Sequence, residues 1–181
     1  MLWGAWGILL MLRRAPEPQV ATNQEAAQRA AQKLQGIVSP ESLSLSPGDH
    51  QRITLTEEEV NSLLQQRMPD AASDQIPGQW MGSVRELKVT FSGDRARIFS
   101  LFSLAGKDIT LQMEGRLHIS GGYLRFEATG GDLGELSLPS SALDMFISRL
   151  LDNPGVREGF RMPAGIRDVR VENGELVIER Q

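Results

Sequence analysis

Apolar and polar residues alternate along the middle of the chain in the pattern of β-strands that have one buried face. The pattern predicts strands over residues 84–91, 95–104, 108–120 and 123–129, joined by short glycine-containing turns. In the longest strand the apolar side consists of Ile109, Leu111, Met113, Leu117 and Ile119, and the polar side of Thr110, Gln112, Glu114, Arg116 and His118. Strands joined by such short turns pair as antiparallel neighbours, so the sequence predicts a meander sheet with one wet face.

Two amphipathic helices are predicted to cover the buried face. In the first, over residues 56–68, Thr56 is the N-cap and Glu59 completes a capping box, and Pro69 stops the helix. The acidic run Glu57 to Glu59 matches the positive end of the helix dipole, which explains it better than a metal site does. The second helix begins at Ser140 or Ser141 and continues to residue 151 with an i, i+3, i+4 apolar stripe.

A hairpin is predicted to close the fold over residues 169–179. Asn173 and Gly174 suit a type I′ turn, which places Val171 opposite Leu176 and Val169 opposite Ile178 on one face. The preceding Gly-rich run, residues 130–134, is expected to be a flexible crossing or a β-bulge. It lacks the directly following helix N-terminus that would bind a phosphate.

The N-terminal residues differ from the rest of the chain. Residues 1–12 carry no charged side chain, and Arg13 and Arg14 follow. Three interpretations remain open: a transmembrane anchor that lacks its first residues, an interfacial anchor with Trp3 and Trp6 at headgroup depth, or a buried helix of a soluble protein. We expect residues 1–14 to be a membrane anchor, residues 15–50 a linker and a weakly docked or stalk helix, and residues 51–181 the folded domain.

Composition excludes several classes of function. The chain has 181 residues, no Cys and a formal net charge of -4 with a pI near 5.3, which argues against nucleic-acid binding and excludes thiolate chemistry. His50 lies in a polar loop and His118 on the wet face of a strand, and neither belongs to a catalytic motif. We therefore expect no catalytic residue, no metal site and no cofactor.

One strand carries more apolar residues than a half-exposed sheet requires. In residues 95–104, Ile98, Phe102 and Leu104 lie on one face, whereas Phe99 and Leu101 lie on the other. If the sheet curls around a helix, an apolar groove can form between them. The residues expected to line such a groove are Leu63, Ile98, Phe102, Leu111, Met113, Phe146 and Leu150. The alternative is that they form an ordinary core, with a helix on one face and a loop or partner on the other.

Three stretches resemble the YpmS-like family of bacterial, single-pass membrane-anchored proteins with a predicted lipid-binding domain. They are residues 53–64 (ITLTEEEVNSLL), residues 134–139 (GELSLP) and Met162-Pro163 with the closing hairpin, within a match over residues 52–179. The resemblance implies a strongly curved sheet wrapped around a helix, as in tubular lipid-binding proteins. It carries over no catalytic residue, and the short N-terminal run departs from the family's full anchor.

Together these observations predict an α+β domain with a strongly curved antiparallel meander on amphipathic helices and an N-terminal anchor. The expected function is non-catalytic binding of a lipid or other apolar molecule, at the cell membrane of a bacterium, with the domain outside the cytoplasm. Arg13 and Arg14, which follow the apolar run, would by the positive-inside rule favour the opposite orientation. The alternative function is an envelope scaffold or regulator that binds a protein partner along a strand edge or apolar patch.

Overall fold

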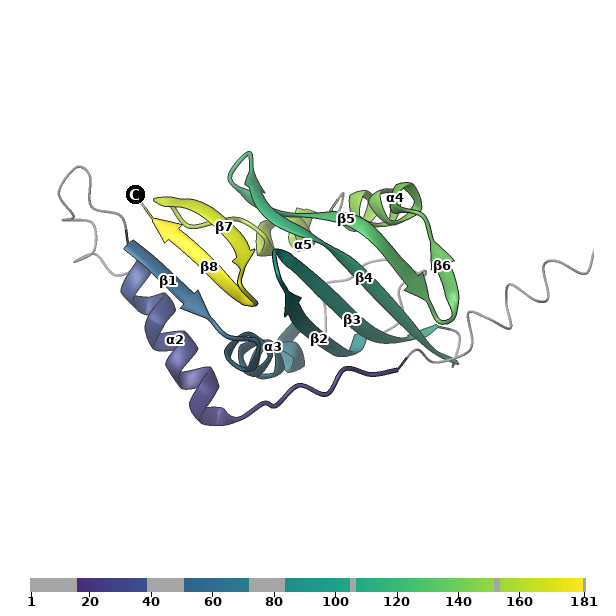
Figure 1. Cartoon of the computed structure of the whole chain (residues 1–181), viewed down its shortest axis with the longest axis horizontal. Helices are drawn as coiled ribbons and strands as arrows, with labels where there is room; N and C mark the ends of the chain where they lie inside the picture. Colours follow the sequence, from purple (N-terminus) through teal and green to yellow (C-terminus); the bar gives the residue numbers. More distant parts are fainter. Residues whose placement is uncertain (1–15, 39–50, 72–83, 105–106, 152–153, 181) are drawn as a thin grey trace, which may run out of the picture.

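The computed structural model describes residues 16–38, 51–71, 84–104, 107–151 and 154–180. They form a mixed fold of helices and antiparallel sheet, which confirms the predicted α+β class (Figure 1). The helices are α2 (Gln24–Val38), α3 (Glu57–Ala71), α4 (Ser140–Leu151) and α5 (Pro154–Gly159). The strands are β1 (Gln51–Leu55), β2 (Val84–Ser92), β3 (Arg95–Leu104), β4 (Lys107–Ser120), β5 (Tyr123–Leu133), β6 (Leu136–Leu138), β7 (Ile166–Glu172) and β8 (Glu175–Arg180).

The described strands form two antiparallel sheets. Strands β2 to β6 make the predicted meander in chain order, and β1 pairs with β8 of the closing hairpin to give the order β1-β8-β7. The hairpin register is as predicted, with Val171 opposite Leu176 and Val169 opposite Ile178. Asn173 and Gly174 both have positive φ, as a type I′ turn requires.

The Gly-rich run belongs to the large sheet. Strand β5 continues through Gly130 and Gly131 to Leu133 and then turns back into β6. The pairing of β4 with β5 shifts between Glu114 and Gly115, so that Thr129 is an extra residue in β5. Of the two expected alternatives, the structure therefore has a β-bulge and not a flexible crossing.

Two helical predictions are corrected. Helix α3 runs to Ala71, so Pro69 lies in its last turn and does not stop it. A proline there removes one backbone hydrogen bond, which the end of a helix tolerates better than its middle does. The sequence also indicated that Asn153, Pro154 and Gly155 end the second helix and that a Pro-containing loop follows, but residues 154–159 form the short helix α5.

Helix α2 is docked and is not a stalk. Its small face, Ala26, Ala27 and Ala30, is buried, and α2 packs against α3 and β1. The sequence suggested weak docking because the apolar residues of α2 are mostly Ala. However, a face of Ala lets two helices approach closely, so α2 docks mainly through small side chains, and Leu34 adds one larger side chain that packs against the core.

The described core has two clusters, one at each end of the molecule (Figure 1). The first lies between the three-stranded sheet and helices α2 and α3, and its buried residues are Ala30, Leu55, Val169 and Ile178. The second lies between the large sheet and α4, and its buried residues are Phe102, Ile109, Leu111, Ala128 and Leu143. No helix in the described part of the chain is long and apolar enough to cross a membrane, and the anchor predicted at residues 1–14 lies outside the described residues.

Candidate functional site

The strand register gathers the apolar residues of the large sheet on one face, here called the inner face. Ile98 pairs with Met113, and Phe102 pairs with Ile109. Leu111 pairs with Leu133 on the other side of β4. Because side chains alternate along a strand, these residues point to the same side of the sheet as Leu87, Val89 and Phe91 of β2.

The structure brings together part of the predicted groove. Phe102, which is 7% exposed, and Leu111 belong to the second core cluster, and Met113 packs against it. Ile98 is half-buried beside Met113. Leu63 instead packs against the first cluster, with Leu55 and Val169, so it does not join the others. Phe146 and Leu150 lie on α4, but their side chains are outside the described part of the structure.

Helices lie at the two borders of the inner face. On one side, α4 packs on β5, where its buried Leu143 lies close to Gly131. On the other side, α3 runs beside the edge strand β2. Phe102 and Met113 of the inner face pack in the second cluster with Leu143 of α4, whereas the half-buried Ile98 belongs to neither described cluster. An apolar strip flanked by helices is a suitable floor for an apolar ligand.

The edge of β2 is closed by polar side chains of α3. The Asn61 amide donates to the Val89 carbonyl at 2.6 Å and accepts from the Val89 N–H at 2.8 Å, so it replaces a neighbouring strand. The Glu57 carboxylate accepts the Phe91 N–H two residues further along. Such pairing blocks the addition of a strand at this edge, which is one way in which proteins avoid edge-to-edge association.

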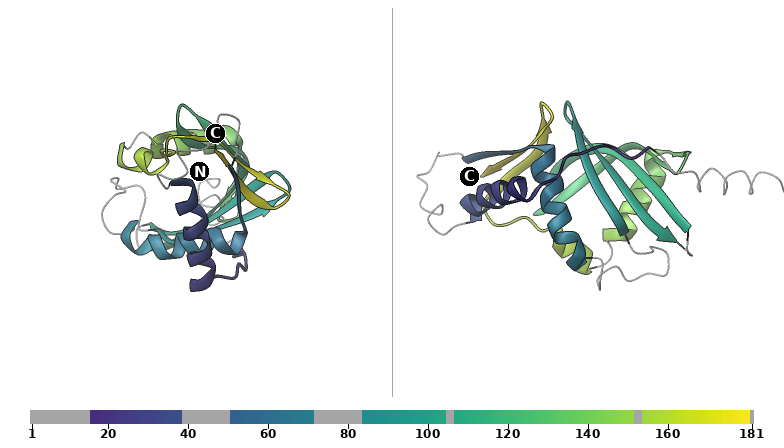
Figure 2. Two further views of the ribbon diagram at one scale, coloured as in Figure 1. Left: turned by 90° about the vertical axis from the view of Figure 1, so that its left-hand side faces the viewer. Right: turned by 90° about the horizontal axis from the view of Figure 1, so that it is seen from below.

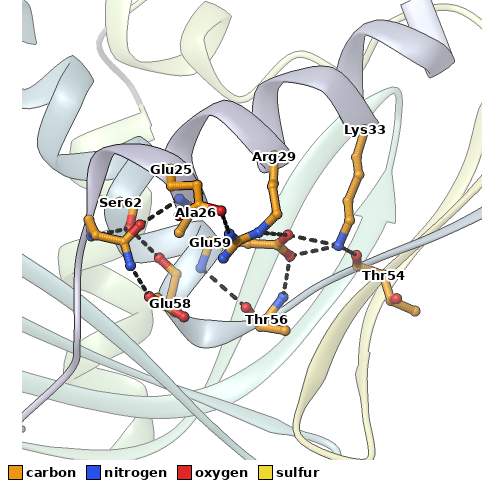
Figure 3. Close-up of polar contacts among 10 residues, drawn as sticks. Glu25, Ala26, Arg29, Lys33, Thr54, Thr56, Glu58, Glu59 and Ser62 are labelled. Atoms are coloured by element: carbon orange, nitrogen blue, oxygen red, sulfur yellow. Dashed lines mark hydrogen bonds and ion pairs between the residues drawn. The ribbon is translucent and has the colours of Figure 1, made fainter.

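The acidic run of α3 therefore has specific partners, which dipole matching alone did not predict. Glu59 is 3% exposed and accepts the Thr56 N–H at 3.0 Å, while the Thr56 hydroxyl accepts the Glu59 N–H at 3.3 Å (Figure 3). This confirms the predicted capping box. Lys33 of α2 donates to Glu59 at 2.8 Å and to the Thr54 carbonyl at 3.0 Å, and Arg29 lies 3.8 Å from Glu59.

The same junction continues at the start of α2. The Asn23 side chain caps α2 by accepting the Ala26 N–H at 2.6 Å and also donates to Glu58. The Asn23 N–H donates to the Ser62 hydroxyl at 3.1 Å. Burial raises the pKa of Glu59, but the hydrogen bonds from Lys33 and Thr56 and the charges of Lys33 and Arg29 outweigh burial, so that this pKa lies below its ordinary value.

The opposite, outer face of the large sheet is polar, as predicted. Glu114 accepts from Arg95 at 2.9 Å and from Arg97 at 2.8 Å, and both arginines hold the pKa of this carboxyl below its ordinary value. A shallow depression of about 440 Å³ lies beside the β-bulge, and its lining includes Arg97, Gln112, Glu114 and Asp132. The lining is mostly polar, but it also includes Met113, one of the residues predicted for the apolar groove.

The N-terminal segment, residues 16–20, crosses this outer face, and we call it the strap (Figures 1 and 2). The Pro16 carbonyl accepts from Gln112 at 3.1 Å, and Glu17 pairs with Lys88. Phe99 is 2% exposed although it lies on the outer face. The sequence predicted a loop or a partner over the outer face of β3, where Phe99 and Leu101 lie. In the structure the strap, a segment of the same chain, lies on this face.

Within the described residues no group of His, Asp and Glu side chains is arranged to hold a metal ion. His118 is exposed, and His50 lies outside the described residues. Comparison of the chain with protein-family models, with curated proteins and with solved structures found no match.

Proposed function

We propose that this chain is a membrane-tethered, non-catalytic protein of the bacterial envelope that binds a lipid or other apolar ligand. The ligand would lie on the inner face of β3 and β4, between α3 and α4, and residues 1–14 would be the single-pass tether of an extracytoplasmic domain. The strongly curved sheet implied by the YpmS-like resemblance belongs to this proposal. A single observation carries it: Ile98, Phe102 and Met113 share one apolar face of the sheet, and Ile98 and Met113 are only half-buried there although Phe102 packs in the cluster beneath α4.

The driving force would be the removal of acyl chain from water. Each buried CH₂ group contributes about 0.8 kcal/mol, so a chain of ordinary length can offset the free energy that binding costs. Ile98 and Met113 are half-buried in the described structure, which leaves them area to lose to a ligand. The ion pairs of Glu114 with Arg95 and Arg97 lie on the outer face. A ligand on the inner face therefore does not remove water from these charged groups.

The test is native mass spectrometry of the full chain, extracted in mild detergent and compared with variants. We expect a bound mass that denaturation releases and that lipid extraction identifies. Ile98→Trp, which fills the strip, should reduce this mass several-fold. Arg97→Trp, at the preceding residue, places the same side chain on the outer face of the sheet and should leave the bound mass unchanged. Lipids around a membrane tether would remain in both variants, so the difference between variants tests the site.

An equal bound mass in both variants, with circular dichroism showing that both are folded, would contradict the proposed site. A chain with no releasable mass would favour the second candidate, a domain that binds a protein partner. That candidate has one observation in its favour, the exposure of Met145 on α4, which is 62% exposed. The closed edge of β2 argues against strand addition there as its mode of binding.

A further inference from the structure

The depression on the outer face lies where the β-bulge leaves a gap in the rows of side chains. Gly130 is opposite Glu114 in the strand register, and a Cβ atom on Gly130 would meet nothing within 4 Å. The hydroxyl of Thr129, the extra residue of the bulge, donates to the Glu114 carbonyl at 3.0 Å and so ties β5 to β4 beside the gap. The volume of about 440 Å³ is within the range of about 300–1,000 Å³ that is typical of small-molecule sites.

Charged groups of both signs line the depression, and bonds within the protein position each of them. Arg95 and Arg97 of β3 both donate to Glu114 of β4, at 2.9 and 2.8 Å. The Asp132 carboxylate of β5 accepts from the Ser137 hydroxyl at 2.7 Å. A guanidinium has five N–H donors, so an arginine that meets Glu114 can still donate to a second group. Two arginines and two carboxylates thus face one polar space.

The two charges that a ligand would meet are set apart by the register of the strands. Both arginines reach over β4 to Glu114, whereas Asp132 lies on the next strand and two positions beyond Gly130. One strand spacing of about 4.8 Å and two residue steps of about 3.3 Å give a separation of about 8 Å. An extended dipeptide holds its ammonium and carboxylate groups roughly 7 Å apart, which is a comparable length.

The lining argues against other ligands. No aromatic ring is among the described residues that line the depression, so a nucleic-acid base has no ring on which to stack. Met113 packs against the second core cluster, so its side chain belongs to the inner face and offers no apolar floor on the outer one. A free phosphate would gain from the arginines but would also be repelled by Glu114 and Asp132.

From these observations we infer that the depression is a second binding site, for a short zwitterionic peptide. The ligand carboxylate lies at Arg95 and Arg97, the ligand ammonium group lies at Asp132, and the backbone between them crosses Gly130. Because no side chain projects from Gly130, the ligand can approach the sheet closely there. The site is on the face opposite the proposed lipid site, and the inference does not rest on that site.

Three small probes separate the two charges of the ligand. The full chain in mild detergent is titrated with glycylglycine, with N-acetyl-glycylglycine, which lacks the ammonium group, and with glycylglycine amide, which lacks the carboxylate. Nuclear magnetic resonance follows the backbone amide signals of residues 129–132. We expect saturable shifts with glycylglycine and at least about fivefold weaker binding of each blocked peptide, because hydrogen bonds to charged groups are the stronger ones.

Variants of the chain test where the probes bind. Gly130→Leu fills the gap and should abolish the shifts, whereas Ser120→Leu, on the exposed far end of β4, should leave the affinity unchanged. Asp132→Asn removes the charge that meets the ammonium group. This variant should therefore bind glycylglycine and N-acetyl-glycylglycine equally and still prefer both to glycylglycine amide.

Several results would overturn the inference. They are the absence of saturable shifts with glycylglycine, equal affinity of the natural chain for all three peptides, tighter binding of inorganic phosphate than of glycylglycine, or binding that a folded Gly130→Leu variant retains. The two sites can also be distinguished from each other. Gly130→Leu should leave the bound lipid mass unchanged, and Ile98→Trp should leave the affinity for glycylglycine unchanged, because the two residues lie on opposite faces of the sheet.

Discussion

Glu59 shows how a single side chain can connect three elements. It caps the helix on which it lies, and it accepts a hydrogen bond from Lys33 of α2, which also donates to the Thr54 carbonyl of β1. The capping box could be predicted because its two residues are three positions apart. The partner Lys33, 26 positions away, could not, since it depends on how α2 docks.

Replacement of Glu59 by Gln should destabilise the fold, because the amide keeps the Thr56 contact but loses the charge that Lys33 and Arg29 meet. We expect a loss of about 1.5–3 kcal/mol in urea unfolding at pH 7, the range for hydrogen bonds to charged groups. Glu25→Gln is the matched control: Glu25 is exposed and forms a surface ion pair with Arg29, so its loss should stay below about 0.5 kcal/mol.

The effect of Glu59→Gln should depend on pH in a defined direction. The folded-state pKa of Glu59 is lowered, so its stabilising contribution is full above the ordinary value of 4.5 and is lost as the pH falls through the folded-state value. The difference in stability between the natural chain and the variant should therefore shrink in acid. A difference that stays constant from pH 7 down to pH 3 would show that the charge of Glu59 is not responsible.

At the scale of elements, the prediction from sequence was most successful where neighbours in the chain are neighbours in space. The meander, its faces and the closing hairpin follow from alternation and turn chemistry. The docking of α2 was left open against a stalk and that of the strap was missed, because a face of Ala and a Pro-containing linker carry little apolar signal of their own. Asn61 was missed for a related reason, since a polar residue in a helix gives no sign that it will replace a strand.

Two adjacent glycines beside the β-bulge should differ in their tolerance of a side chain. A Cβ atom on Gly131 would lie 2.2 Å from the Gln112 carbonyl oxygen and 3.1 Å from Leu143, whereas one on Gly130 would meet nothing within 4 Å. Gly131→Ala should therefore cost at least about 2 kcal/mol, as overpacking of a core typically does. Gly130→Ala should be neutral or stabilise the fold by about 0.5 kcal/mol, because it restricts the unfolded chain.

Thermal unfolding of both glycine variants by circular dichroism checks this prediction. The contact of Gly131 with Leu143 also links the bulge to the position of α4. A Gly131→Ala variant as stable as the natural chain would mean that β4, β5 and α4 are less closely packed than the structure shows, and the border of the proposed ligand site would then be in doubt.

At the scale of the whole molecule, the chain divides its apolar residues between two clusters and leaves the middle of the large sheet between two helical borders. The seven predicted groove residues illustrate what the sequence can supply. Those on β3 and β4 share a face because strand periodicity fixes it. Leu63 joined the other cluster, because the direction in which α3 packs is a tertiary property that its own apolar stripe does not specify.

The most direct test of the account is photo-crosslinking of the full chain in membranes with a diazirine-bearing fatty acid, followed by mapping of the modified residues. Trypsin separates the two central strands into residues 98–107 and 108–116. The account predicts that the label is attached to inner-face residues, Ile98, Phe102, Leu111 or Met113. Label confined to residues 1–14, or distributed equally over Phe99 and Leu101 of the outer face, would contradict a lipid site on the inner face.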